Sequence, residues 1–197
     1  RDPIWIAHRE GRAKDGRDLT EPAVIKMLTL SRERGEAPEA VLSDLNIVPL
    51  VIAYEVDPCD ALKAAELAAG KGYVKAEFED VSSIARGITG EKGCVHLHFG
   101  EPLPADLSVE EVVAALDRQM AQHYRLYHTN RWAWEWLHGE SVPAELTFHE
   151  GSVAEQSFRA RIESVPSEHR QWLLTMYANP VSRQLARDVT DQDPSCD

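Results

Sequence analysis

The sequence contains no apolar run long enough to cross a membrane as a helix. Its longest apolar stretch, Ile47–Tyr54, is interrupted by Pro49 and falls far short of the roughly 20 apolar residues that span a bilayer. The start of the sequence carries no signal-peptide pattern, because Arg1-Asp2-Pro3 leads into a short strand-like segment and not into an apolar region with a cleavage site. An initiator Met is also missing, so we expect a processed or truncated chain.

Cysteine and basic residues are scarce. Cys59, Cys94 and Cys196 are far apart and form no C-x-x-C pair, which favours free thiols in a reducing compartment over a disulfide framework or a zinc site. The 21 Lys and Arg residues face 33 Asp and Glu residues, which gives a formal net charge of −12. Such a charge argues against nucleic acid as a partner and provides no attraction to anionic lipid surfaces.

The residues that are present are typical of a folded globular protein, since 43% are hydrophobic and 27% are charged. Leu45–Tyr54 is nearly continuous in apolar and β-branched residues, as in a strand buried on both faces of a parallel sheet. Pro49 within it is expected at a bulge or an unpaired position. Helix starts are indicated at Asp57-Pro58, by an acidic cap and a proline, and at Ser108–Glu111, by a capping box.

Strands that alternate with helices predict an α/β fold. We expect a mostly parallel sheet covered by helices over residues 1–105, followed by a helical C-terminal extension over 106–190. The acidic residues 191–197 are expected to form a disordered tail.

The first candidate site is a charged loop between the strand-like segment Ile4–Ala7 and the helix expected after Thr20. Guanidinium groups bind phosphate through bidentate hydrogen bonds, and glycines let the backbone approach a ligand closely. On composition alone a solvated charged turn is the competing interpretation, because short charged motifs match often by accident. The charged and glycine residues of the loop include Arg9, Glu10, Gly11, Arg12, Lys14, Gly16 and Arg17.

A second motif favours the phosphate site. Val48–Tyr54 fits the pattern [V/I]-P-[V/I/L]-x-[V/I]-x-Y, and together with Glu10-Gly11-Arg12 it resembles the third and fourth sequence blocks of the glycerol-phosphate and lysophospholipid acyltransferase family. The family's third block is usually E-G-T-R-S, so the match drops one threonine. Further segments that are similar to a bacterial subgroup of the family are Asp57–Asp60, Gly72–Lys75, Val95–Pro102, Thr129-Asn130 and Tyr177–Pro180.

This resemblance implies O-acyl transfer in phospholipid biosynthesis. A His in an H-x-x-x-x-D motif would deprotonate a hydroxyl of the acceptor, which would attack the thioester of acyl-CoA or acyl-carrier protein, with no further cofactor. The acceptor would be glycerol 3-phosphate or lysophosphatidic acid. The resemblance assigns acceptor binding to Glu10, Gly11 and Arg12, with Lys14 and Arg9 behind them, and the shape of the pocket to Val48 and Pro49.

The catalytic motif itself is missing, because none of the eight His residues is followed by an Asp five positions later. In the family it precedes the Glu-Gly-Arg block, so we expect it upstream of Arg1 and expect the chain alone to be inactive. The full-length enzyme would be cytoplasmic and peripheral on the inner face of the cell membrane, held through the missing N-terminal part. The alternative is a non-catalytic module that binds a phosphate or a lipid precursor.

Two further patterns are assigned structural roles. His96 and His98 would share one face of a strand, as metal ligands can, but a zinc site needs three or four ligands and we predict none here. Trp132, Trp134 and Trp136 alternate, which favours roles in helix packing and the core over a belt at a lipid interface.

Overall fold

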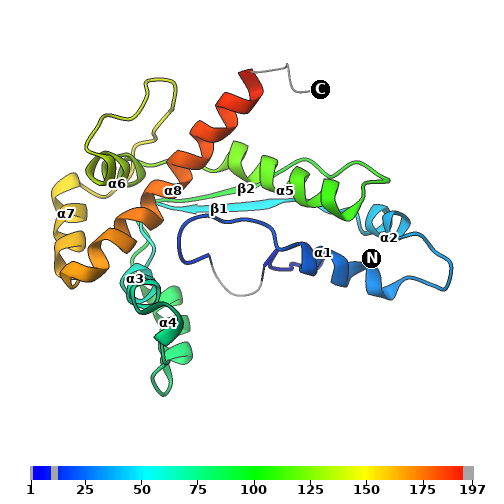
Figure 1. Cartoon of the computed structure of the whole chain (residues 1–197), viewed down its shortest axis with the longest axis horizontal. Helices are drawn as coiled ribbons and strands as arrows, with labels where there is room; N and C mark the ends of the chain where they lie inside the picture. Colours follow the sequence, from blue (N-terminus) through cyan, green and yellow to red (C-terminus); the bar gives the residue numbers. More distant parts are fainter. Residues whose placement is uncertain (1, 10–12, 193–197) are drawn as a thin grey trace. The chain divides into compact units, whose positions relative to one another are not determined.

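A computed structural model describes residues 2–9 and 13–192, with side chains placed as far as residue 186. Helices make up 54% of the chain. The elements in chain order, labelled as in Figure 1, are α1 (Pro22–Leu28), η1 (Thr29–Ser31), α2 (Pro38–Leu45), β1 (Leu50–Tyr54), α3 (Asp60–Ala69), η2 (Gly70–Gly72), α4 (Glu79–Thr89), β2 (Val95–Phe99), α5 (Val109–His123), α6 (His128–His138), α7 (Glu155–Ser164) and α8 (Ser167–Gln192).

The sheet is two-stranded and antiparallel, with β1 against β2. The N–H of Glu55 donates to the carbonyl of Cys94, and the N–H of Gly100 donates to the carbonyl of Pro49, each at 2.9 Å. The end of β1 is therefore paired with the start of β2, as expected for antiparallel strands. The prediction of an α/β fold with a mostly parallel sheet is therefore wrong. The connection from β1 to β2 contains α3 and α4, and it brings the chain back antiparallel to β1 instead of crossing over to a parallel strand.

The apolar run that suggested a parallel sheet is buried mainly on one face. Within β1, Val51 and Ala53 are buried, whereas the alternate residues are half-buried. Val48 lies outside the strand and is 40% exposed. The continuous apolar pattern concealed this alternation, since the second face is also lined by apolar residues. Pro49 precedes the strand, where its missing N–H removes no bond within β1.

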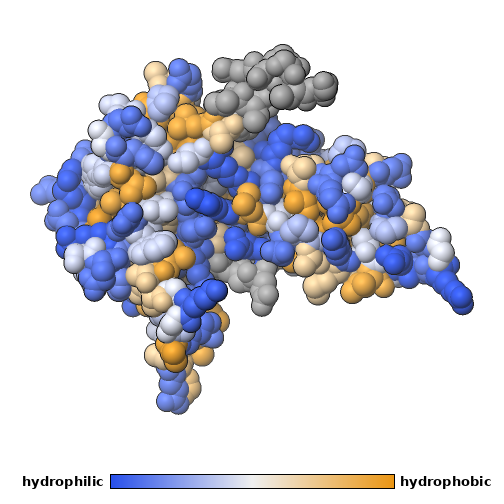
Figure 2. Space-filling model, viewed as in Figure 1, coloured by the Kyte–Doolittle hydropathy of each residue, from blue (hydrophilic) through white to orange (hydrophobic). Residues whose placement is uncertain are grey.

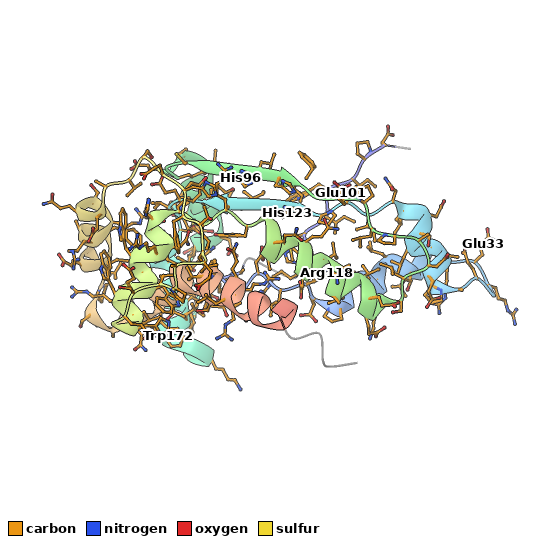
Figure 3. All side chains as sticks on the ribbon, turned by 90° about the horizontal axis from the view of Figure 1, so that it is seen from above. Glu33, His96, Glu101, Arg118, His123 and Trp172 are labelled. Atoms are coloured by element: carbon orange, nitrogen blue, oxygen red, sulfur yellow. The ribbon has the colours of Figure 1, made fainter. Side chains whose placement is uncertain are left out.

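In β2 the apolar residues are on the exposed face. Val95, Leu97 and Phe99 are exposed, while His96 and His98 are half-buried. The ring of His98 stacks on His123, at the end of α5, with centroids 4.0 Å apart (His123 is labelled in Figure 3). Among the described residues, no group of three or more His, Cys, Asp or Glu could hold a metal ion.

The chain divides into two compact units, which are interleaved in sequence. Unit 1 comprises Arg1–Ala13, Asp18–Val51 and Leu97–His123, and unit 2 comprises Lys14–Arg17, Ile52–His96 and Tyr124–Asp197. The sequence-based division at 105/106 and 190/191 stays a prediction. In the described part of the chain, no helix combines the length and the apolar character needed to span a membrane.

In unit 1, α1 packs against α5 around a small apolar cluster. Thr20 joins the two helices, because its backbone N–H and its hydroxyl donate to Asp117 of α5 at 2.8 and 2.7 Å. Its side chain is therefore used for a tertiary contact and not for capping, and the N-cap of α1 is Glu21. The buried members of the cluster are Ile25, Leu42, Val112 and Leu116.

The capping box at the start of α5 is confirmed. The N–H of Ser108 donates to Glu111 at 2.8 Å, and the N–H of Glu111 donates back to the Ser108 hydroxyl at 3.3 Å. We expect Ser108→Ala to lower the free energy of unfolding by about 1 kcal/mol, measured by urea denaturation, because a helix N–H loses its acceptor. Glu111→Gln keeps an acceptor at the same place and should cost less. Equal stability of wild type and Ser108→Ala would contradict the capping role.

In unit 2, α8 packs against α3, α6 and α7. Phe158 of α7 is fully buried at the centre, where its ring contacts Trp132, Trp136 and Tyr177. Trp134 is 7% exposed in a neighbouring cluster. The predicted core and packing roles of the three tryptophans are thus confirmed.

Candidate functional site

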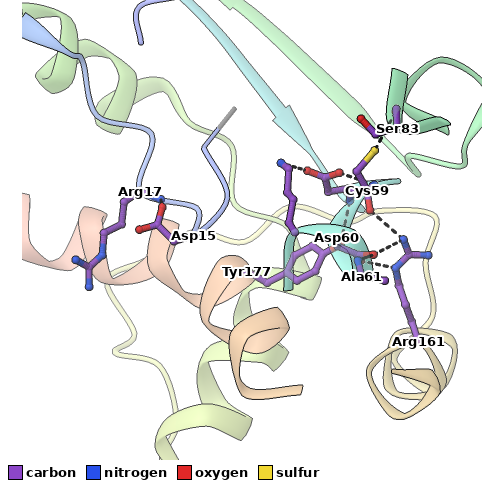
Figure 4. Close-up of polar contacts among 10 residues, drawn as sticks. Asp15, Arg17, Cys59, Asp60, Ala61, Ser83, Arg161 and Tyr177 are labelled. Atoms are coloured by element: carbon purple, nitrogen blue, oxygen red, sulfur yellow. Dashed lines mark hydrogen bonds and ion pairs between the residues drawn. The ribbon is translucent and has the colours of Figure 1, made fainter. Parts of the chain in front are cut away.

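A buried ion pair lies at the start of α3 in unit 2. The carboxylate of Asp60, 1% exposed, accepts two hydrogen bonds from the guanidinium of Arg161, at 2.5 and 2.8 Å (Figure 4). The hydroxyl of Tyr177, on α8, donates to the same carboxylate at 2.8 Å. Arg161 also donates to the carbonyl of Asp57 at 2.9 Å. The network therefore fixes α7 and α8 to the first turn of α3.

The electrostatics of the network keep Tyr177 and Arg161 in the states that these bonds require. Burial, together with the nearby charge of Asp60, raises the pKa of Tyr177 well above its usual value, so its hydroxyl stays a donor. Burial alone would lower the pKa of Arg161, but the bond to Asp60 raises it overall. The guanidinium of Arg161 thus stays charged, as a charge-assisted pair of hydrogen bonds requires.

A cavity of about 310 Å³ opens beside this ion pair. Its walls come from the start of α3, the end of α4 and the end of α7, and they include Arg86 and Arg161. Gly90, which follows α4, packs closely against Pro58, which precedes α3, since a Cβ at position 90 would lie 2.5 Å from the Cβ of Pro58. A side chain there would push the two helices apart and open the wall.

The cavity is suited to binding rather than to covalent chemistry. It presents the guanidinium groups of Arg86 and Arg161 together with the carboxylates of Asp60 and Glu91. The hydroxyl of Ser164, which also lines it, donates to the Arg161 carbonyl at 2.7 Å. Because Asp60 already neutralises Arg161, the arrangement can accept a small polar group or a side chain of a partner through Arg86 and Glu91.

A second buried carboxylate, Glu55, lies at the end of β1 and is 2% exposed. It accepts hydrogen bonds from the backbone N–H groups of Cys94, Ser152 and Val153 at 2.7, 2.9 and 2.7 Å. Its own carbonyl accepts a bond of 2.7 Å from the hydroxyl of Thr129. Burial raises the pKa of Glu55, but the bonds from these N–H groups outweigh burial and lower it below its usual value. Glu55 thus fastens the loop before α7 to the sheet.

The predicted phosphate site is only partly described by the structure. Glu10, Gly11 and Arg12 lie outside the described residues. Arg9 is half-buried in unit 1, and Lys14, in unit 2, forms an ion pair with Glu66 of α3. That pairing would compete with a phosphate for Lys14. Anion binding by the loop stays a prediction.

The segment 14–17 is held against α8 at a proline. Pro180 lacks an N–H, so the helix does not use the carbonyl of Met176 in the ordinary way. Gly16, with φ +76°, packs against that carbonyl so closely that any Cβ would overlap it. Asn179 donates to the carbonyl of Asp15 at 2.6 Å, and Figure 4 shows Asp15 beside α8. Gly16 is therefore needed for this contact.

Val48 and Pro49, which were predicted to shape the pocket, both lie in unit 1. Val48 is exposed, and the carbonyl of Pro49 accepts the hydrogen bond from Gly100 that continues the strand pairing. Sequence reasoning missed Arg161 and Tyr177 as partners of Asp60. The acidic helix start at Asp57–Asp60 was visible in the sequence, but the partners of Asp60 lie 101 and 117 residues further along the chain.

Comparisons with known proteins found a similarity to one translation factor. No protein-family model matches the chain, and no solved structure matches it. The chain is similar to elongation factor Ts from Kocuria rhizophila, with 32% identity over 130 residues. The similar region covers 66% of this chain and 45% of that protein, so the chain spans less than half the length of this relative.

The acyltransferase interpretation is corrected by these findings. The relative found is a translation factor, and no comparison supports an acyltransferase. Glycerol phosphate, lysophosphatidic acid, acyl-CoA and acyl-carrier protein are therefore not supported as partners, and membrane-associated lipid biosynthesis is not supported as a role. The short motifs that carried the resemblance are modestly specific, and the mostly parallel sheet that was predicted beside them is absent from the described residues. The predicted location at the cytoplasmic face of the membrane stays a prediction.

Proposed function

We propose that this chain acts in translation elongation as a factor that binds a protein component of the elongation machinery. The observation that carries the proposal is the similarity to elongation factor Ts over 66% of the chain. Under this proposal the chain works by association and not by catalysing a chemical step.

Charge supports a protein as the partner. With a net charge of −12, the chain would be repelled by RNA phosphates, and contacts to RNA would need a basic patch. A protein partner places no such requirement on the chain. The cavity beside Asp60 and Arg161 offers polar groups that a partner side chain could meet.

The proposal is tested in a translation system reconstituted from purified components. We expect the added chain to change the rate of polyphenylalanine synthesis on a poly(U) template in a saturable way, since that reaction isolates elongation from regulated initiation. An unrelated acidic protein of similar size, at equal concentration, controls for effects of charge. An unchanged rate, together with no binding to any purified component of the system, would overturn the proposal.

A further inference from the structure

Helix α4 of unit 2 carries small residues on its inward face and large apolar residues on its outward face. Its inward face carries small residues, Ser83 at 7% exposure and the half-buried Gly87. The carbonyl of Ser83 accepts a bond from the thiol of Cys59, at the start of α3. Small residues on this face let α4 approach α3 closely.

The outward face of α4 carries the large apolar residues. Val81, Ile84 and Ile88 are 64%, 60% and 74% exposed. Their spacing of i, i+3 and i+7 places them in one row along the helix. Figure 2 shows hydrophobic residues at the surface of this helix, at the bottom of the view. A surface helix normally packs such a row against the core. On α4 the row is exposed to solvent instead, which is typical of a binding surface.

Two exposed apolar residues lie in the segment that leads into α4. Phe78 is 73% exposed and has a φ of +63°, a left-handed conformation that is unfavourable for an aromatic residue. Val74 is 86% exposed. A strained backbone that holds a large aromatic side chain in water does not serve the stability of the free chain. We call Val74, Phe78, Val81, Ile84 and Ile88 the α4 surface.

We propose that the α4 surface docks into an apolar groove of the protein component that this chain binds in elongation, so this inference rests on the proposed function. A helix bound in a groove is held by anchors at i, i+3 and i+7, which is the spacing of Val81, Ile84 and Ile88. A groove also covers the sides of the helix, so it can bury most of each side chain.

Charge argues against a lipid surface as the occupant. Residues 71–92 contain four basic and four acidic residues, and Lys75 pairs with Asp80 at 2.7 Å. Glu79 accepts a hydrogen bond of 2.6 Å from the hydroxyl of Tyr73. A helix that binds anionic lipid headgroups is instead rich in Lys and Arg on its polar side.

Shape argues against a second copy of this chain. Two convex helices that cross each other touch over a short stretch and would leave the ends of an 11-residue helix uncovered. A concave partner therefore fits this surface better than another α4 does.

The test uses the whole chain with the substitution Ile84→Asp, and separately the double substitution Val81→Ser with Ile88→Ser. Each is titrated against the purified soluble factors of a reconstituted elongation system. We expect either variant to bind its component roughly tenfold or more weakly than wild type, as for loss of an interface anchor. The matched control is Leu30→Asp, in unit 1, where the leucine is 76% exposed. Unchanged circular dichroism and thermal midpoints establish that the variants are folded.

The outcomes separate the two proposals. Wild-type binding that Ile84→Asp leaves unchanged would overturn the role of the α4 surface and leave the elongation proposal standing. A wild-type chain that binds no component would overturn the elongation proposal and the partner assigned to α4 with it. Concentration-dependent dimers, or binding to phosphatidylglycerol–phosphatidylethanolamine vesicles, that Ile84→Asp abolishes would assign the surface to a second copy or to lipid and so overturn the groove.

Discussion

The Arg161→Ala variant is expected to lose about 3 kcal/mol of its free energy of unfolding, which is the lower end of the cost of breaking a buried ion pair. The substitution leaves the carboxylate of Asp60 1% exposed and without its charged partner. The Arg161 side chain itself is 32% exposed, so water that replaces it can partly solvate Asp60, which places the expectation at the lower end. Urea denaturation at neutral pH measures the loss.

Two variants make this result specific. Arg159→Ala removes a neighbouring arginine that lies over the ring of Trp136 and contacts Glu155 at 3.4 Å, and this exposed residue should cost no more than about 1 kcal/mol. Arg161→Lys keeps the charge but cannot make two parallel hydrogen bonds, so its loss should be intermediate. Equal losses in Arg161→Ala and Arg159→Ala would show that the ion pair does not hold α7 to α3.

The Glu55→Ala variant is expected to lose about 3 kcal/mol as well, because the buried N–H groups of Cys94, Ser152 and Val153 lose their acceptor at a cost of roughly 1–3 kcal/mol each, relieved in part by water. The vacated space lies next to Gly151, so the loop before α7 should also become more mobile. Hydrogen exchange at the amides of Ser152 and Val153 measures that change directly.

The pH dependence of stability distinguishes the charge of Glu55 from its shape. Its pKa in the folded state is lowered below 4.5, so its contribution is fully present above pH 4.5 and is lost as the pH falls through the folded value. In Glu55→Gln this part of the acid loss should disappear, because the side chain no longer titrates. Glu145→Gln, at an exposed position, serves as the control. An identical acid slope in wild type and Glu55→Gln would remove Glu55 as its source.

The sequence by itself determined the local elements whose signals lie within a few residues. The helix expected after Asp57-Pro58 is present as α3, although it begins at Asp60 with Cys59 as its N-cap, and Asp57 accepts the N–H of Cys59 at 2.7 Å in the turn before it. The start of α5 follows the capping box at Ser108. The alternation of Cys94–Phe99 also predicted a strand there, and β2 spans Val95–Phe99. These features depend on hydrogen bonds and on repeats of side-chain direction that involve residues only a few positions apart, so short stretches of sequence specify them.

Only the tertiary structure decided how the elements pair and which faces they cover. The direction of β1 against β2 depends on where α3 and α4 return the chain, and the run Leu45–Tyr54 reads alike for a parallel and an antiparallel strand. The partners of Asp60 and Glu55 are about 100 residues away, as with Arg161 and Ser152, and no local pattern links them. The face that α4 covers likewise depends on its neighbour, because α3 lies beside the small residues Ser83 and Gly87 and leaves the large apolar residues of α4 exposed. Long-range contacts are selected by the packing of the whole unit, and that is why they could not be read from the order of residues.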